Sequence, residues 1–276
     1  MENTFTANTR VRKITNDHVA DVDDQLAVEE PLEIHLQYGD AGNRVQKSIS
    51  VTMRTPGHDP ELASGFLFTE GIIQSNKDIL FIEQEAHDKN RILLALQENV
   101  NPGLQKTERN FYTTSSCGVC GKSSIDAIKI VSLYKKEADN IILKAELFYD
   151  IHDSVRNRQA IFDSTGGIHA SALFDLDGNF IMLREDVGRH NALDKLIGAS
   201  LLNEQLPLSN TILLLSGRAS FELIQKACMA GIKIITAVGA PSSLAVELAK
   251  EWNITLIGFL RNERFNIYSG EQRIVL

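Results

Sequence analysis

The sequence predicts an α/β protein with a helix-covered sheet in its C-terminal half and a smaller α+β part before it. In the last third, apolar strand-like runs alternate with helix-like segments, from Thr211–Leu215 to Ile254–Phe259. Nearer the start, Leu32–Leu36 and Ser48–Met53 flank a turn rich in Gly, Asp and Asn, which predicts a hairpin. The 276 residues, 43% of them hydrophobic, are enough for one large domain or two small ones.

The N-terminal part divides into an arm and a small domain. Residues 1–30 are mixed and acidic, and we expect a mobile arm that joins the fold near Pro31. After the hairpin, the apolar spacing predicts a short helix at Glu61–Gly71 and a strand at Arg91–Leu96. A charged, turn-rich run at residues 135–140 then predicts a boundary between a smaller α+β domain, residues 31–138, and an α/β domain, residues 139–276.

The C-terminal part shows regular alternation of the two element types. Such alternation implies a largely parallel sheet covered by helices. Helices are predicted near Leu147–Val155, Leu193–Leu201, Phe221–Cys228 and Leu244–Trp252, and strands at Ile168–Asp175, Asn179–Leu183, Thr211–Leu215, Ile232–Val238 and Ile254–Phe259.

The charge, hydrophobicity and cysteine content of the chain exclude several classes of function. A net charge of −8 argues against nucleic-acid backbone binding as the main task, although a local arginine cluster could still hold an anion. The absence of a long apolar run predicts no membrane span, and the polar start does not predict a secretory signal. Three cysteines do not make a disulfide scaffold, so we expect a cytoplasmic protein whose cysteines are thiols.

A pair of cysteines, Cys117 and Cys120, carries the strongest chemical signal. Gly118 and Gly121 favour an accessible loop, and the apolar spacing that follows predicts a helix beginning just beyond it. A helix N-terminus and the neighbouring Lys122 would both favour the thiolate, which is the reactive form of cysteine. A persulfide carrier needs such a thiolate on a flexible tether.

Other interpretations of this pair stay open. One CxxC is half of a four-ligand zinc site, but no second CxxC exists, and Cys228 lies on an apolar helix face that predicts burial, so we expect no metal. A thioredoxin-like oxidoreductase is the other alternative, although here the motif follows a long polar loop rather than an early buried strand.

Two further segments are candidates for ligand binding. In the stretch Thr165–Ser171, His169 resembles the first residue of the His-x-Glu motif of zinc deaminases, but Ser171 stands at the Glu position and no Pro-Cys-x-x-Cys follows. His169 is therefore as compatible with a structural as with a functional role. Arg189 and His190, together with Asp186, could converge on a ligand or could form a solvated helix start.

Two loops form the best candidate for a phosphate cradle. One follows the strand that ends at Leu215, the other follows the strand that ends at Val238, and each leads into a helix N-terminus. Ligands of parallel sheets bind at this carboxyl edge, where small residues and helix N-termini can hold phosphate. Ordinary helix caps are the alternative. The candidate residues are Ser216, Arg218 and Ser220 of the first loop, Gly239 and Ser242 of the second, and Arg261 and Arg264 after the last strand.

These motifs together resemble the FdhD family, the sulfur carriers needed for formate dehydrogenase activity. The resemblance covers nearly the whole chain from about Pro31. The segments that carry it are Gly65–Ile73, Cys117–Gly121, Thr165–Ala170, Glu185–Lys195, Ser216–Glu222, Ala237–Glu247 and Gly258–Phe259.

The resemblance implies a fold and a chemistry. It implies a cytidine-deaminase-like C-terminal α/β domain without the zinc deaminase site, and a homodimer. It also implies that Cys117 accepts sulfur from a cysteine desulfurase as a persulfide, with Cys120 as an auxiliary cysteine. The sulfur would pass to the bis-molybdopterin guanine dinucleotide form of the molybdenum cofactor, for which GDP should be a mimic, before insertion into formate dehydrogenase. The implied cofactor segment is Phe259, Leu260, Arg261, Asn262, Glu263 and Arg264.

Two other functions are compatible with the same residues. A thiol–disulfide oxidoreductase would need a reactive Cys117 but no nucleotide crevice. A non-catalytic chaperone that only binds the cofactor would need the crevice but no reactive thiol. Because both features occur, the sulfur carrier is the favoured interpretation.

Overall fold

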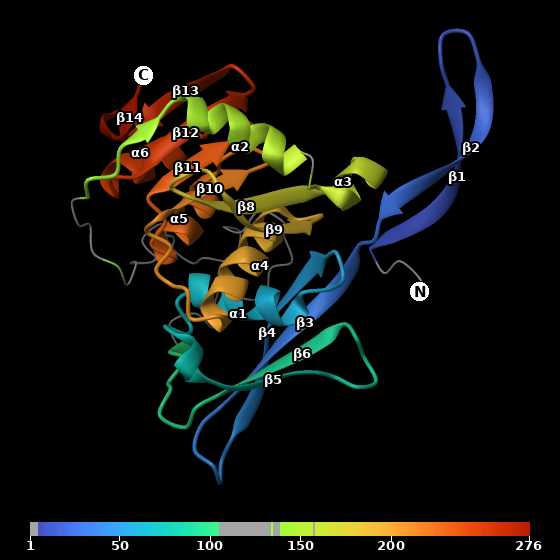
Figure 1. Ribbon diagram of the computed structural model, residues 1–276. Helices are drawn as coiled ribbons and strands as arrows, with labels where there is room; N and C mark the ends of the chain where they lie inside the picture. Colours follow the sequence, from blue (N-terminus) through green and yellow to red (C-terminus); the bar gives the residue numbers. More distant parts are fainter. Residues whose placement is uncertain (1–4, 105–133, 135–138, 157) are drawn as a thin grey trace.

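The computed structural model describes residues 5–104, 134, 139–156 and 158–276 (Figure 1). The N-terminal part contains β1 (Thr6–Ile14), β2 (Val19–Ala27), β3 (Glu30–Tyr38), β4 (Val45–Arg54), α1 (Asp59–Thr69), β5 (Ile79–Gln84) and β6 (Arg91–Leu96). The C-terminal part contains β7 (Leu143–Lys144), α2 (Glu146–Arg156), α3 (Ala160–Thr165), β8 (His169–Asp175), β9 (Phe180–Asp186), α4 (Arg189–Leu202), β10 (Thr211–Leu215), α5 (Phe221–Met229), β11 (Ile234–Ala237), α6 (Ser243–Glu251), β12 (Thr255–Arg261), β13 (Arg264–Ser269) and β14 (Ile274–Val275).

The N-terminal arm is a β-hairpin. Strands β1 and β2 pair antiparallel, and Arg12 contacts Asp21 across them at 2.9 Å. Figure 1 shows the hairpin extending away from the rest of the molecule, with its base near α3. The sequence did not predict these strands, and the expected mobility of the arm stays a prediction.

A four-stranded sheet follows the arm. Its order is β4-β3-β6-β5, and β3 and β6, which are not consecutive in the chain, pair parallel in its centre. The predicted hairpin of β3 and β4 and the predicted helix α1 are confirmed. The edge strand β5 was not predicted.

The larger sheet has six strands in the order β13-β12-β11-β10-β8-β9. Its centre is parallel, as β10 pairs with β11 and β11 with β12. The prediction of a largely parallel sheet is wrong for the flanks, because β8, β9 and β13 are all added in antiparallel pairings. Short connections explain two of these pairings: β9 follows β8, and β13 follows β12, through tight turns that can join only antiparallel neighbours.

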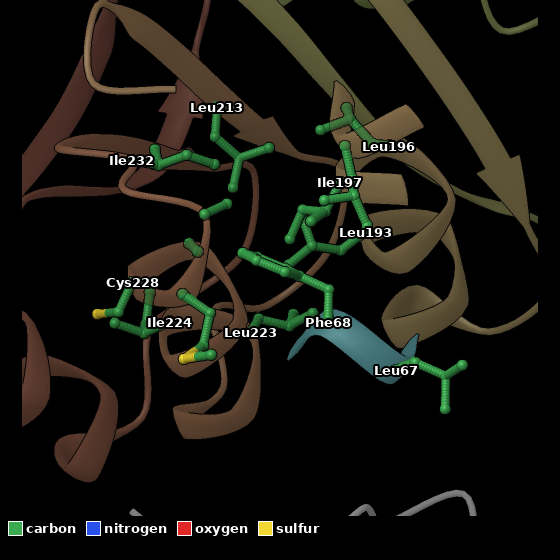
Figure 2. Close-up of a cluster of buried hydrophobic side chains, with 14 of the residues drawn as sticks. Leu67, Phe68, Leu193, Leu196, Ile197, Leu213, Leu223, Ile224, Cys228 and Ile232 are labelled. Atoms are coloured by element: carbon green, nitrogen blue, oxygen red, sulfur yellow. The ribbon is translucent and has the colours of Figure 1, made fainter. Parts of the chain in front are cut away.

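Successive side chains of β10 point to opposite faces of the sheet, where they join two different hydrophobic cores. Leu213 and Leu215 face the core formed with α4, α5 and α6, whereas Ile212 and Leu214 face the core formed with α2. The first of these cores continues into the four-stranded sheet, so the two sheets share buried side chains. Helices α1 and α4 lie between the sheets, and Figure 2 shows Phe68 of α1 among side chains of α4 and α5.

Candidate functional site

The carboxyl ends of β10, β11 and β12 meet at one edge of the larger sheet, as the sequence predicts. Their loops are joined by backbone hydrogen bonds: Gly239 N donates to Gly217 O at 2.9 Å, and Phe259 N donates to Gly239 O at 3.1 Å. Gly239 is needed for this approach, because a Cβ there would lie 2.9 Å from Arg218 N. The three loops therefore form a continuous wall.

A pocket of about 560 Å³ opens at this edge, a size suited to a nucleotide-sized ligand. Two of the predicted residues, His169 and Ser216, line it. The Ser216 hydroxyl accepts a hydrogen bond from Ala170 N at 2.8 Å, which holds the start of β8 against the first loop. The other lining residues are His152, Val155, Gln159, Phe162, Gly166, Gly167, Ile168, Val187, Leu214 and Val238.

His169 is half-buried beside the first loop. A Cβ on Gly217 would lie 3.3 Å from His169 Nδ1, so the imidazole packs directly against this glycine. Burial, and then the positive charges of Arg189 and His190, lower the pKa of His169, with a smaller opposing effect of Asp186. The imidazole is therefore neutral at neutral pH and can donate or accept a hydrogen bond in the pocket.

Arg189 and His190 begin α4 close to His169. His190 Nε2 lies 2.9 Å from Glu222 Oε2, which joins the start of α4 to the start of α5. Burial opposes ionisation of Glu222, but the close contact with His190 and the positive charges of His190 and Arg189 outweigh burial and lower the carboxyl pKa. Within the described residues, Arg189 Nε is buried without a hydrogen-bond partner, so this side chain can still bind a ligand.

The expected helix N-termini are present at the same edge. Ser220 is the N-cap residue of α5, and its buried hydroxyl has no hydrogen-bond partner among the residues that the structure describes. Ser242 caps α6 by accepting from Ala245 N at 3.3 Å. The Arg218 side chain is exposed between them. Free N–H groups and an exposed guanidinium are the donors that phosphate prefers.

The predicted cofactor segment continues from this wall. Phe259 is 43% exposed and has a positive φ of 53°, which is uncommon for a bulky residue and lies at a bulge between β12 and β13. Such strained backbone is concentrated at functional sites. Arg261 Nη1 donates to Val238 O at 2.7 Å, and Asn262 Nδ2 donates to Asp153 of α2 at 3.3 Å.

The remaining members of this segment differ in accessibility. Glu263 and Arg264 are exposed in the turn and at the start of β13. The Leu260 side chain is fully buried in the core beside α2. Leu260 can therefore offer a ligand its backbone but not its side chain.

Asp186 does not face the ligand site. Its carboxylate is fully buried, lies 2.7 Å from Lys195 Nζ and accepts from Thr55 N at 3.2 Å. Asn191 Nδ2 also donates to Asp186, at 3.1 Å, instead of being a surface cap. The hypothesis that Asp186 converges on a ligand with Arg189 and His190 is thus wrong, because it holds α4 to the chain that follows β4.

Cys117 and Cys120 lie outside the described residues. Cys228 is buried on α5, as the sequence predicts. Sequence reasoning missed Gln159 and Glu222 as members of the site. Glu222 stands within a quoted motif but could be recognised only once α4 and α5 were seen to meet, and Gln159 carries no signal in the sequence.

The described residues hold neither a cluster of metal-ligating side chains nor a helix of membrane-spanning length. In that part of the chain no three His, Cys, Asp or Glu side chains are grouped so that they could hold a metal ion. No helix in it is long and apolar enough to cross a membrane.

Several known proteins are similar to this chain over nearly its whole sequence. A protein named sulfur carrier protein FdhD from Mycolicibacterium paratuberculosis is 48% identical over 276 residues, covering 98% of each chain. The proteins of the same name from Streptomyces coelicolor and Picrophilus torridus are each 45% identical, covering 98% and 92% of this chain and 96% and 93% of their own.

The fold is also found in a crystal structure. A candidate formate dehydrogenase accessory protein from Desulfotalea psychrophila superimposes with a TM-score of 0.75 at 23% identity, over 98% of this chain and all of that chain. This likeness concerns the fold, and it agrees with the mixed α/β architecture. The model of the FdhD/NarQ family matches residues 27–275. This chain therefore belongs to the FdhD/NarQ family.

Proposed function

We propose that this protein is a sulfur carrier for formate dehydrogenase. It takes sulfur from a cysteine desulfurase as a persulfide on Cys117 and passes it to the bis-molybdopterin guanine dinucleotide molybdenum cofactor, bound at the carboxyl edge of the larger sheet. The names of relatives at 45–48% identity support sulfur carriage. The observation that carries the cofactor assignment is the convergence of three strand ends, two helix N-termini and a pocket at one edge.

The cofactor's two nucleotide arms suit this edge chemically. Each arm ends in a guanosine linked through a diphosphate. The pocket beside His169 can take a base and its sugar, and the diphosphate would then lie over the N-terminus of α5, within reach of Arg218. An acidic protein can bind such an anion because these donors are local.

Sulfur transfer would proceed through two exchange steps. The Cys117 thiolate attacks the outer sulfur of the desulfurase persulfide, so a new S–S bond forms and the desulfurase thiolate leaves. Delivery of that sulfur as sulfide needs two electrons. The Cys120 thiolate supplies them by attacking the Cys117 sulfur atom, so that the S–S bond of the persulfide breaks and hydrosulfide leaves toward the cofactor. The Cys117–Cys120 disulfide that remains must be reopened by a cellular thiol reductant. A homodimer, implied by the family, is part of this proposal.

Activation of formate dehydrogenase tests the proposal. In cells that lack their own carrier, the wild-type chain should restore enzyme activity, whereas Cys117→Ala should not. Cys228→Ala is the matched control, because that cysteine packs in the core and should leave activation intact. Normal activation by Cys117→Ala would favour the chaperone function instead, and GDP binding by this variant would show that it is folded.

A further inference from the structure

The lining of the pocket favours an uncharged group, because no Lys or Arg side chain of the described residues lines it. Its apolar lining side chains are those of Val155, Phe162, Ile168, Val187, Leu214 and Val238, and its polar ones are those of His152, Gln159, His169 and Ser216. A diphosphate would lose its hydration in such surroundings, whereas a heteroaromatic base would bury apolar faces and needs polar partners only at its edge.

Gln159 supplies an unused polar group in this interior. Only 7% of the residue is exposed, and its Nε2 is buried without a hydrogen-bond partner among the described residues. The residue is the N-cap of α3, but its side chain does not cap the helix; its backbone carbonyl accepts from Asp163 N at 2.9 Å. A buried amide donor without an acceptor is rare in folded proteins, and it marks a position where a ligand can supply the acceptor.

The segment that carries Gln159 is held in place from the sheet. Glu185 of β9 accepts hydrogen bonds from Ile161 N at 3.4 Å and from Phe162 N at 3.2 Å. These bonds satisfy N–H groups in the first turn of α3 and hold the start of this helix, which bears the pocket residues Gln159 and Phe162, against β9. The backbone that carries Gln159 is therefore anchored to β9.

We infer that Gln159 selects guanine, by donating a hydrogen bond from Nε2 to the O6 carbonyl of a base held in this pocket. The inference rests on the proposed function and names the residue that gives its nucleotide site base specificity. Guanine presents an acceptor at O6, where adenine presents an amino donor. An adenine base would place its amino group against Nε2. Pairing with it would require the Gln159 amide to rotate and present Oε1 instead, so we expect adenine to bind less tightly.

Calorimetry with GDP and ADP tests the inference. Wild-type protein should bind GDP at least about tenfold more tightly than ADP, and inosine diphosphate, which keeps O6, should behave like GDP. Gln159→Leu keeps the side-chain size but removes the donor, so GDP should weaken to near the affinity of ADP. The thermal midpoint of the unliganded variant should not fall, because the substitution removes a buried donor that has no hydrogen-bond partner in the unliganded protein.

A control substitution at another glutamine and a second substitution at Gln159 complete the test. Gln272→Leu makes the same change in a separate surface pocket, and it should leave the GDP-to-ADP ratio unchanged. If Gln159→Leu does not fold, Gln159→Glu replaces the donor with a carboxylate and should reverse the preference toward ADP. An unchanged ratio in a folded Gln159 variant would overturn base selection but leave the carrier function standing. Failure of the wild-type protein to bind GDP would instead reject the nucleotide site itself.

Discussion

Gly65 of α1 and Gly198 of α4 lie face to face where the two helices cross. A Cβ at Gly65 would lie 2.9 Å from Gly198 N and 1.9 Å from Asp194 O, and a Cβ at Gly198 would lie 1.8 Å from Glu61 O. No side chain fits at either position. This crossing joins the four-stranded sheet to the sheet that bears the candidate site.

Substitution at this crossing should destabilise the fold strongly. Gly198→Ala forces backbone against backbone, and we expect a loss of at least about 3 kcal/mol in the free energy of unfolding, the upper range for overpacking. Gly42→Ala is the control, because nothing lies within 4 Å of a Cβ there, and it should change stability by less than about 1 kcal/mol. Urea denaturation measures both; equal effects would contradict the close crossing.

The ion pair of Glu61 and Arg184 should make stability depend on pH. Burial opposes ionisation of Glu61, but Arg184, whose Nη2 lies 2.8 Å from Oε1, and His58 outweigh it and lower the carboxyl pKa to about 2 from an ordinary 4.5. Stabilisation by a lowered carboxyl pKa is complete above the ordinary value and is lost as pH falls through the lowered one. The Glu61 contribution should thus disappear between about pH 4.5 and pH 2.

Glu61→Gln measures this contribution. At pH 7 the variant should be less stable than wild type by about 1–3 kcal/mol, and the difference should shrink below pH 4.5. Glu98→Gln, an exposed carboxyl, is the control. A difference between Glu61→Gln and wild type that stays constant from pH 7 to pH 2.5 would show that the pair does not act through ionisation.

Lys226 is held in a buried network between three helices. Its Nζ lies 2.9 Å from both carboxylate oxygens of Asp194 and 2.9 Å from Thr69 Oγ1. Lys226→Met would leave the buried Asp194 carboxylate unpaired and should cost about 3–5 kcal/mol. Adding Asp194→Leu should recover part of this loss, with a coupling of about 1–3 kcal/mol in a double-mutant cycle. Additive effects would contradict a shared network.

The exposed Arg218 should act on the phosphates of a nucleotide rather than on its base. Arg218→Ala should weaken GDP binding by about 1.5–3 kcal/mol, the range for hydrogen bonds to charged groups, and should hardly change guanosine binding. Arg10→Ala, an exposed arginine on the N-terminal hairpin, should change neither. Calorimetry that finds Arg218→Ala and wild type equal for GDP would place the diphosphate elsewhere.

Much of the larger sheet could be predicted because its strands are continuous apolar runs. Thr211–Leu215 is such a run, and β10 has those bounds. The hairpin of β1 and β2 was missed because its strands are rich in charges, such as Arg12 and Asp21, whose pairing depends on a register that the sequence does not state. The strand β13 was missed for a similar reason, since its residues are mostly exposed and carry little periodicity.

The site residues in loops directly after strands could be predicted from the sequence. Those brought to the site by contacts between segments far apart in the chain could not. Ser216, Arg218, Gly239 and Ser242 follow buried strands directly, so the rule for parallel sheets placed them together. Gln159 reaches the pocket because a carboxylate from β9 binds the start of α3. That contact joins residues more than twenty positions apart, and local sequence patterns do not record it.

Mass spectrometry of Cys117 tests the central claim most directly. After incubation with a cysteine desulfurase and cysteine, the peptide that contains Cys117 should gain the mass of one sulfur atom, and a thiol reductant should remove it. The Cys117→Ala variant should acquire no such adduct on Cys120 or Cys228. Absence of an adduct on wild-type protein, or an adduct on Cys228 instead, would contradict sulfur carriage by Cys117.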